Sequence, residues 1–264
     1  MADNVLIVGY GQVGRGIYGL YKDKEEFKVY YTGLTESSGE IDDLLKEDVN
    51  VMHVCIPYSH SFESDVTEYI TKYSPKLTII NSTVPMGTTR TIYAMNSTSK
   101  DSELEFNEHI VHSPVMGVHP NLTKGIKTFK KIVGGCTNKA AHMATAHFES
   151  LGVKTLAYSN SDESEAAKLL STSYYHWNVV FMKYIHKMCQ EQDLNFQHVY
   201  QFTNEIYNEG YDELGMQFVK RPILKYMPGK TGGHCLIPNL KLIKNIFYPA
   251  TVALELENAS AQTH

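Results

Sequence analysis

The residues best suited to bind a cofactor lie at the start of the sequence. The segment VLIVGYGQVGRG leads an apolar run directly into Gly9, Gly11 and Gly14. This GxGxxG spacing is typical of a dinucleotide-binding turn: the first glycine makes the turn, the second lets the backbone approach a pyrophosphate, and the third lets a helix pack on a strand. We expect the phosphates to face the N–H groups near Gln12 and Val13. A glycine-rich turn without a ligand is the alternative interpretation.

A second candidate segment, NSTVPMGTTR, covers residues 81–90 and follows the expected fourth strand. The carboxyl ends of the strands in a doubly wound sheet face the ligand crevice, so Ser82 and Thr83 are placed to contact a nicotinamide or a substrate hydroxyl. The alternative interpretation is structural, a helix that begins at Thr88. The expected cofactor contacts come from the ends of four strands: Gly9, Gly11, Gln12, Val13, Gly14, Thr32, Pro57, Tyr58, Ser82 and Thr83.

A third candidate segment, PGKTGGHCLIPN, contains a cysteine that could act as a nucleophile. Cys235 follows two glycines and His234, and an adjacent imidazole can lower the pKa of a thiol. An inert buried thiol is the alternative interpretation. We expect no metal site here, because no second pair of ligands lies at the spacing of a zinc site.

Lys168 belongs to a long predicted helix but lies off its apolar stripe. Apolar residues at steps of three and four, from Ala166 to Cys189, predict one amphipathic helix over residues 161–193. Lys168 shares a different face with Thr172 and Tyr175. It could contact a ligand there or be solvated, which is the usual state of a lysine. The apolar surplus of this helix predicts a homodimer.

The sequence leaves the choice between NAD and NADP open. Residues 27–32, FKVYYT, predict the second strand, whose end normally provides a carboxylate to the ribose hydroxyls. Thr32 and Gly33 occupy this place, and the next carboxylate is Glu36. We expect no arginine close by to hold a 2′-phosphate.

The order of elements predicts an α/β fold. After the first strand we expect strands at residues 27–32, 51–57, 76–81, 109–112, 131–134 and 154–157, alternating with helices such as 61–73 and 139–150. This alternation favours right-handed crossovers and a doubly wound, mostly parallel sheet. We therefore assign residues 1–160 to a dinucleotide-binding Rossmann domain.

Residues 161–264 predict a helical dimerisation and substrate domain. Ser161 or Asp162 can cap the long helix, and Glu163 and Glu165 suit the positive end of its dipole. A second helix is expected at 195–209, followed by an irregular segment at 210–238 and a partly apolar stretch that ends in a polar tail.

Composition argues against several classes of protein. The net charge of the 264-residue chain is −5, which gives no general attraction for nucleic acid. We interpret the one basic run, Lys124, Lys127, Lys130 and Lys131, as a solvated loop and strand edge. The sequence has no run of about 18 apolar residues, so we expect no membrane-spanning helix. The N-terminus lacks the features of a signal peptide. The four cysteines lack CxxC spacing, which suits reduced thiols and a cytoplasmic protein.

Taken together, these segments resemble the nucleotide-sugar dehydrogenase family, the UDP-glucose and UDP-N-acetylmannosamine dehydrogenases. GYGQVG, STVPMGTT, KIVGG, SDESEAAKLL and PGKTGGHCLIP follow one another in the family's order across residues 3–243. The resemblance implies an NAD- or NADP-dependent Rossmann domain and a central helical domain that forms the dimer. It also implies a C-terminal UDP-binding domain, for which we expect this chain to be too short.

The resemblance implies roles for three residues. Cys235 matches the nucleophile that attacks the sugar aldehyde formed by a first hydride transfer, before a second transfer gives a thioester that water hydrolyses. Lys168 matches the lysine that stabilises the oxyanion. Thr83 matches the threonine that orders water and cofactor.

Three other positions depart from the family pattern. Val115 stands in place of a glutamate, Thr172 in place of an asparagine and Asn239 in place of an aspartate. A general base contributes about 10²- to 10⁴-fold in rate. The absence of two carboxylates therefore predicts that full four-electron oxidation is impaired.

Three functions fit these residues. The first is an NAD(P)-dependent oxidoreductase acting on a sugar-like or other anionic, hydroxyl-bearing substrate, such as a nucleotide sugar. The second is a dinucleotide-binding protein that has lost catalysis and serves as a sensor or assembly partner. The third is kinship to the prephenate or β-hydroxyacid dehydrogenases, suggested by His112 and His119 in HSPVMGVHPN.

Overall fold

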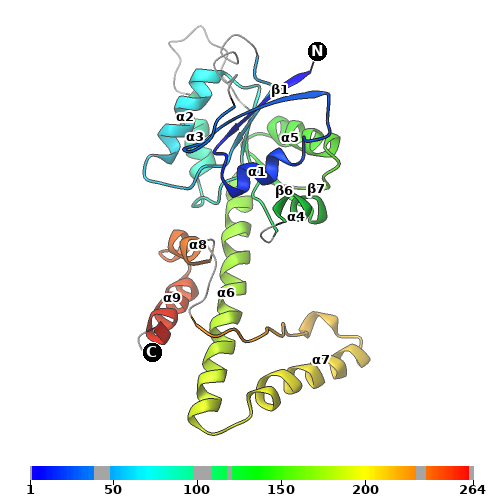
Figure 1. Ribbon diagram of the computed structural model, residues 1–264, viewed down its shortest axis with the longest axis vertical. Coiled ribbons are helices and arrows are strands. Elements are labelled where there is room, and N and C mark those ends of the chain that lie inside the picture. Colours follow the sequence, from blue (N-terminus) through cyan, green and yellow to red (C-terminus); the bar gives the residue numbers. More distant parts are fainter. Residues whose placement is uncertain (1, 39–47, 98–108, 118–120, 230–235, 262–264) are drawn as a thin grey trace. The chain divides into compact units, whose positions relative to one another are not determined.

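The computed structural model describes residues 2–38, 48–97, 109–117, 121–229 and 236–261 (Figure 1). The chain forms two compact units, Met1–Lys168 and Leu169–His264. The boundary between them falls within the long helix α6, Ser161–Glu191.

The first unit is built on a seven-stranded sheet with the order β2-β1-β3-β4-β5-β6-β7. All neighbouring strands pair in parallel except β5 and β6, which are antiparallel. The doubly wound α/β fold predicted from the sequence is therefore confirmed. The strands are β1 Asp3–Val8, β2 Phe27–Thr32, β3 Val51–Val54, β4 Leu77–Ile80, β5 Ile110–His112, β6 Lys131–Gly135 and β7 Thr155–Tyr158.

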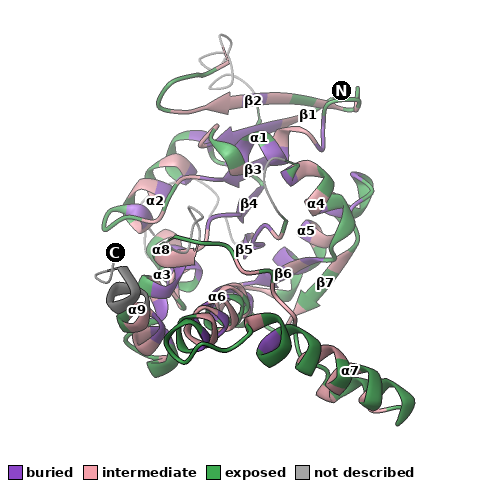
Figure 2. Ribbon diagram, turned by 60° about the horizontal axis from the view of Figure 1, so that its bottom comes forward, coloured by how far each residue is buried: buried purple, intermediate pink, exposed green. Residues whose placement is uncertain are grey.

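Helices cover both faces of this sheet. Alternate side chains of a strand point to opposite faces, so Val5 and Ile7 of β1 enter one core while Leu6 and Val8 enter the other. The first core also takes residues of α1, α4 and α5, and the second those of α2 and α3 (Figures 1 and 2). The helices are α1 Gln12–Tyr18, α2 Phe62–Tyr73, α3 Thr88–Ser97, α4 Leu122–Thr128 and α5 Asn138–Ser150.

A chain of polar side chains crosses the first of these cores. Asn81 Nδ2 lies 3.0 Å from His53 Nδ1, and the Tyr21 hydroxyl lies 2.6 Å from both His53 Nε2 and His147 Nε2. Burial lowers the pKa of His147 to about 4 and that of His53 well below its ordinary value. Both imidazoles are therefore neutral at pH 7, and the hydroxyl between them can donate to one and accept from the other.

All regular structure in the described residues of the second unit is helical. Leu240 and Ile243 of α8 pack with Ala250 of α9 and with Leu169 at the start of this unit. The remaining elements are the π-helical η2 Gln197–Phe202, α7 Thr203–Glu213, the 3₁₀ turn η3 Gln217–Val219, α8 Leu236–Ile243 and α9 Tyr248–Ala261.

Several local expectations were wrong. The helix expected at 195–209 begins with the π-helical η2 and extends to Glu213, and α8 already begins at Leu236, so the segment 210–238 is not wholly irregular. Glycine inside a helix costs only about 1 kcal/mol relative to alanine, and α7 accordingly continues through Gly210. We expected the helix to end before Gly210, although a helix tolerates a glycine at this small cost.

The expectation for the basic run was wrong in part. Lys124 and Lys127 are exposed but lie on α4 rather than in a loop, and Lys131 is 4% exposed in β6. Lys130 is exposed between these elements, as expected. The Lys131 side chain projects from the sheet toward α5, where its Nζ lies 4.9 Å from the centre of the Phe148 ring, and this packing accounts for its burial.

The start and the stripe of α6 also differ from expectation. Asn160, not Ser161 or Asp162, caps the helix, because its Oδ1 accepts from the Glu163 N–H at 2.9 Å. Four residues of the expected apolar stripe are exposed to solvent rather than packed, namely Leu170, Trp177, Phe181 and Met188.

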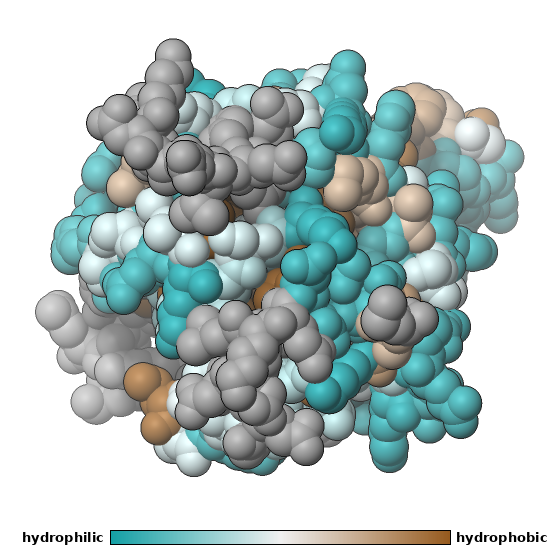
Figure 3. Space-filling model, turned by 90° about the horizontal axis from the view of Figure 1, so that it is seen from above, coloured by the Kyte–Doolittle hydropathy of each residue, from teal (hydrophilic) through white to brown (hydrophobic). Residues whose placement is uncertain are grey.

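No helix in the described parts of the chain has the length and apolar character needed to cross a membrane. The face of the molecule drawn in Figure 3 is mainly hydrophilic.

Candidate functional site at the carboxyl edge of the sheet

Four parallel strands end at the same edge of the sheet. Val8 pairs with both Thr32 and Val54, and Val54 pairs with Ile80. The segments that follow these strands therefore emerge side by side. Together with Thr32, the last residue of β2, they contain every residue for which we expected contact with a cofactor: Gly9, Gly11, Gln12, Val13, Gly14, Pro57, Tyr58, Ser82 and Thr83.

Gly9 is required by the close approach of two backbone segments. Its φ is +95°, and a Cβ built on it would lie 2.7 Å from the carbonyl carbon of Cys55 and 2.8 Å from the nitrogen of Ile56. Its N–H donates to the Thr32 carbonyl at 2.7 Å. A side chain at this position would push β1 away from the segment that follows β3.

Gly11 and Gly14 have opposite surroundings. A Cβ at Gly14 would lie 2.0 Å from the carbonyl oxygen of Gly9, so this glycine lets α1 pack against the turn. A Cβ at Gly11 would meet nothing within 4 Å, and Gly11 and Gln12 are exposed. The turn thus leaves open backbone at the position where the motif requires a pyrophosphate to approach, and its residues fit a dinucleotide.

The second strand ends beside an ion pair that we did not expect. Arg15 Nη2 lies 2.7 Å from Glu36 Oε2, and both side chains are exposed. The expectation that no arginine lies close to the end of β2 is therefore wrong. Arg15 is remote in sequence from Glu36, and only the fold brings α1 next to the segment after β2.

The segment after β4 is held at its start by Ser82. The Ser82 hydroxyl donates to the Ile56 carbonyl at 2.6 Å, and the Ser82 carbonyl lies 3.1 Å from Nε2 of the buried His112. Thr83 beside it is half-buried. Further along, Pro85 and Gly87 line a shallow depression together with Tyr58.

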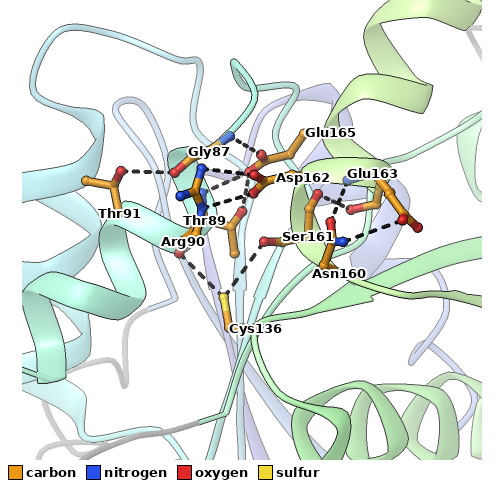
Figure 4. A network of polar contacts seen from close by, with 11 residues as sticks. Gly87, Thr89, Arg90, Thr91, Cys136, Asn160, Ser161, Asp162, Glu163 and Glu165 are labelled. Carbon is orange, nitrogen blue, oxygen red and sulfur yellow. Dashed lines mark hydrogen bonds and ion pairs between the residues drawn. The ribbon is translucent and has the colours of Figure 1, made fainter.

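The far end of the same segment is held by Glu165, a buried residue of α6. Its carboxylate accepts from the Gly87 N–H at 2.6 Å, the Thr89 N–H at 2.8 Å and the Thr89 hydroxyl at 2.6 Å (Figure 4). Burial raises the pKa of Glu165 to about 7, although these three donors act to lower it. The carboxylate caps the first turn of α3 from a distant part of the sequence.

An exposed ion pair adds a second contact between α6 and α3, beside the hydrogen bonds that Glu165 accepts from Gly87 and Thr89, which we call the Glu165 clamp. Arg90 Nη2 lies 3.0 Å from Asp162 Oδ2, so the first turn of α6 contacts α3 through a second acidic residue (Figure 4). Cys136 lies below, with its Sγ 3.7 Å from the Thr89 carbonyl oxygen, and burial raises the pKa of its thiol to about 11. That thiol is protonated at neutral pH and inert as a nucleophile.

We expected Glu165 to lie at the positive end of the α6 dipole and did not predict its burial. A signal was present, because Ser161, Leu169 and Ser173 lie at four-residue steps from Glu165 on one buried face of α6. A carboxylate within such a stripe must be paired with donors.

Two lysines hold the segment after β5. Lys131 Nζ donates to the Ser113 carbonyl at 2.7 Å and to the Pro114 carbonyl at 3.1 Å, and Lys168 Nζ donates to the Val115 carbonyl at 2.8 Å. Burial lowers the pKa of Lys131 to about 7. Three consecutive carbonyls are thus fixed by two amines, one of them the half-buried Lys168.

The other expected catalytic residues belong to the second unit. Asn239 Nδ2 donates to the Thr172 hydroxyl at 3.3 Å, so the structure brings these two together. Cys235 and His234 lie outside the described residues. Among those that are described, no group of three or more histidine, cysteine or acidic side chains could hold a metal ion.

The strand order and the glycine turn define a Rossmann-type fold. Among solved structures, the UDP-glucose dehydrogenase of Pyrobaculum islandicum is similar with a TM-score of 0.73 and 12% identity, covering 98% of this chain and 68% of that one. The 3-hydroxyisobutyrate dehydrogenase of Mycobacterium tuberculosis has a TM-score of 0.65 and 12% identity, covering 100% of this chain and 95% of that one.

Proteins of similar sequence indicate which kind of dehydrogenase this chain resembles. The chain is 27% identical over 163 residues to the UDP-N-acetyl-D-mannosamine dehydrogenase of Methanocaldococcus jannaschii, a match that covers 61% of this chain and 33% of that enzyme. The corresponding enzyme of Methanococcus vannielii is 25% identical over the same length. No family model matches the sequence. The resemblance to nucleotide-sugar dehydrogenases is confirmed, and the chain spans about a third of the length of these curated relatives.

The Glu165 clamp generates a prediction for stability. Thr89→Val removes the hydroxyl that donates to the buried carboxylate, whereas Thr91→Val removes an exposed hydroxyl that donates to the Gly87 carbonyl just before α3. A lost hydrogen bond to a buried charge costs about 1.5–3 kcal/mol. We expect Thr89→Val to lower the free energy of unfolding by about this amount and Thr91→Val to change it by less than about 0.5 kcal/mol.

Urea denaturation followed by circular dichroism measures both variants. Equal midpoints for Thr89→Val and Thr91→Val would contradict a stabilising role for the hydrogen bond between Thr89 and Glu165.

Proposed function

We propose that this protein is an NAD(P)-dependent oxidoreductase that oxidises a hydroxyl group of a nucleotide sugar. The observation that carries the proposal is the open backbone at Gly11, on the edge of the sheet that also presents Ser82 and Thr83. The names of the sequence relatives support a UDP-sugar as substrate. NAD is the cofactor we favour, and NADP is the alternative.

When bound, a nicotinamide would accept the hydride released by the carbon that carries the hydroxyl group. In the proposed reaction Thr83 orients this end of the site, and the first oxidation leaves an aldehyde. The Cys235 thiolate then adds to the carbonyl carbon and the carbonyl oxygen becomes an alkoxide, which the Lys168 ammonium stabilises. Loss of a second hydride, to a second molecule of oxidised nicotinamide cofactor, would give a thioester, and water would release the acid and restore the thiol.

Hydrolysis of the thioester, the last proposed step, has the least support from the residues of this chain. Val115 and Asn239 stand where the resemblance implies carboxylates, and Lys168 donates to the Val115 backbone. Without a carboxylate to remove a proton from water, thioester hydrolysis slows by about 10²- to 10⁴-fold. We propose that the enzyme then turns over slowly, with the acyl group held on Cys235 as the thioester, so that the full four-electron oxidation is impaired.

The two alternative functions have weaker support. A sensor that binds the dinucleotide without catalysis fits the missing carboxylates, and it predicts cofactor binding with no turnover. Kinship of mechanism with β-hydroxyacid dehydrogenases required His112 near the crevice, yet His112 is fully buried and burial lowers its pKa to about 3. His119 lies outside the described residues.

We also propose that the protein forms a homodimer through α6. Its second-unit portion exposes a row of large apolar side chains, an uncommon feature of a monomer surface: Leu170, Tyr174, Trp177, Phe181 and Met188. A self-complementary pair of such faces would cover them. Light scattering at micromolar concentration should give the mass of a dimer, and a Phe181→Glu variant should give that of a monomer. A monomeric wild type would refute this assembly.

Gly11→Val tests the cofactor site. Because a Cβ there meets nothing within 4 Å, the variant should keep its fold while its side chain fills the space needed by a pyrophosphate. We expect at least a tenfold loss of affinity for NAD and NADP by calorimetry, with an unchanged thermal unfolding midpoint, and loss of the reduced-cofactor absorbance that wild type produces with UDP-sugars. Unchanged affinity in this variant would remove the assignment, and binding without turnover in wild type would favour the sensor.

Alkylation tests the proposed nucleophile. Burial raises the pKa of Cys55 to about 12 and that of Cys136 to about 11, and Cys189 is 1% exposed. If Lys168 stabilises a Cys235 thiolate, Cys235 should react with iodoacetamide faster than these three at pH 7, and Lys168→Met should slow it.

Mass spectrometry of each modified peptide as a function of pH measures these rates. A Cys235 that reacts no faster than the other cysteines, and is indifferent to Lys168, would leave the covalent mechanism without support.

A further inference from the structure

The ion pair between Arg15 and Glu36 lies where a dinucleotide distinguishes NAD from NADP. Arg15 directly follows the glycine turn on α1, and Glu36 belongs to the segment after β2. In Rossmann domains a carboxylate near the end of the second strand accepts the ribose hydroxyls of NAD, whereas an arginine accommodates the 2′-phosphate of NADP. This chain has one group of each kind, 2.7 Å apart.

Arg15 is held at the turn by more than its carboxylate partner. Its Nε donates to the Tyr10 carbonyl at 3.3 Å, and its guanidinium carbon lies 5.2 Å from the centre of the Tyr10 ring. The Tyr10 ring is stacked on that of Tyr31 in β2, with 3.7 Å between ring centres. These contacts fix the guanidinium between the glycine turn and the second strand.

The segment that carries Glu36 is folded back onto the same place. The Ser38 N–H donates to the Tyr31 carbonyl at 2.9 Å, and the Ser37 hydroxyl donates to the Thr32 hydroxyl at 3.3 Å. A Cβ at Gly33 would lie 3.1 Å from the Tyr10 nitrogen, so this segment packs directly on the glycine turn. Glu36 therefore takes the position that Thr32 leaves without a carboxylate.

We propose that Glu36 selects NAD over NADP by occupying Arg15. The carboxylate can accept hydrogen bonds from the two ribose hydroxyls while it stays paired with the guanidinium. A 2′-phosphate would meet the negative charge of Glu36 and find its natural partner, Arg15, already bound. This inference rests on the proposed dinucleotide site and adds the residue that sets its specificity.

Removing the carboxylate should reverse the preference. Glu36→Gln keeps the length of the side chain but frees Arg15 for a bidentate contact with the phosphate. We expect NADP to bind about 10- to 100-fold more tightly than to wild type, the range of a charge-assisted hydrogen bond, and NAD to bind a few-fold more weakly. Adding Arg15→Gln should abolish the gain for NADP.

Isothermal calorimetry with NAD and NADP at fixed ionic strength measures these affinities without any turnover. Glu26→Gln is the matched control, because it removes the same charge from an exposed pair with Lys24 on the same unit. Its ratio of affinities for the two cofactors should equal that of wild type.

Other results would overturn the inference. A wild type that prefers NADP, a Glu36→Gln variant with an unchanged ratio, or a gain that survives Arg15→Gln would each refute Glu36 as the selector while leaving the dinucleotide site in place. A wild type that binds neither cofactor would refute the proposed function as well.

Discussion

The contact between Gly9 and the backbone that follows β3 is the constraint on which the edge of the sheet depends. With no side chain in between, the turn after β1 lies against the peptide of Cys55 and Ile56, and its N–H reaches Thr32. Ser82 then bonds the Ile56 carbonyl. Four strand ends are thereby joined by backbone contacts and one serine hydroxyl, and a ligand would meet a surface that needs little reorganisation on binding.

Much of this arrangement could be predicted from local patterns. The glycine spacing, the apolar strands and the position of the NSTVPMGTTR segment after β4 each depend on a few neighbouring residues, and these predictions agree with the observed elements. The direction of crossovers is nearly invariant, so parallel order followed from alternation. Motif and topology together were sufficient to place Thr32, Pro57 and Ser82 at one edge of the sheet.

The missed features are long-range contacts between charged groups. Glu165 meets α3 across 76 residues of sequence, Lys131 packs on Phe148 of α5, and Arg15 meets Glu36 because α1 lies beside the segment after β2. Charged residues are exposed in most proteins, so a sequence pattern assigns them to solvent by default. Burial of a charge becomes apparent only when the fold provides its donors, as the Gly87 N–H does for Glu165.

The bond from Lys168 to residue 115 uses the backbone rather than a side chain. Every amino acid has the same carbonyl, so the position can exchange glutamate for valine during evolution without releasing the lysine. This hydrogen bond thus makes the position of the Lys168 amine independent of the side chain at residue 115, which sets the acid–base chemistry beside it. A protein with this hydrogen bond could lose the carboxylate at residue 115 with its fold intact, and regain the carboxylate later by one substitution.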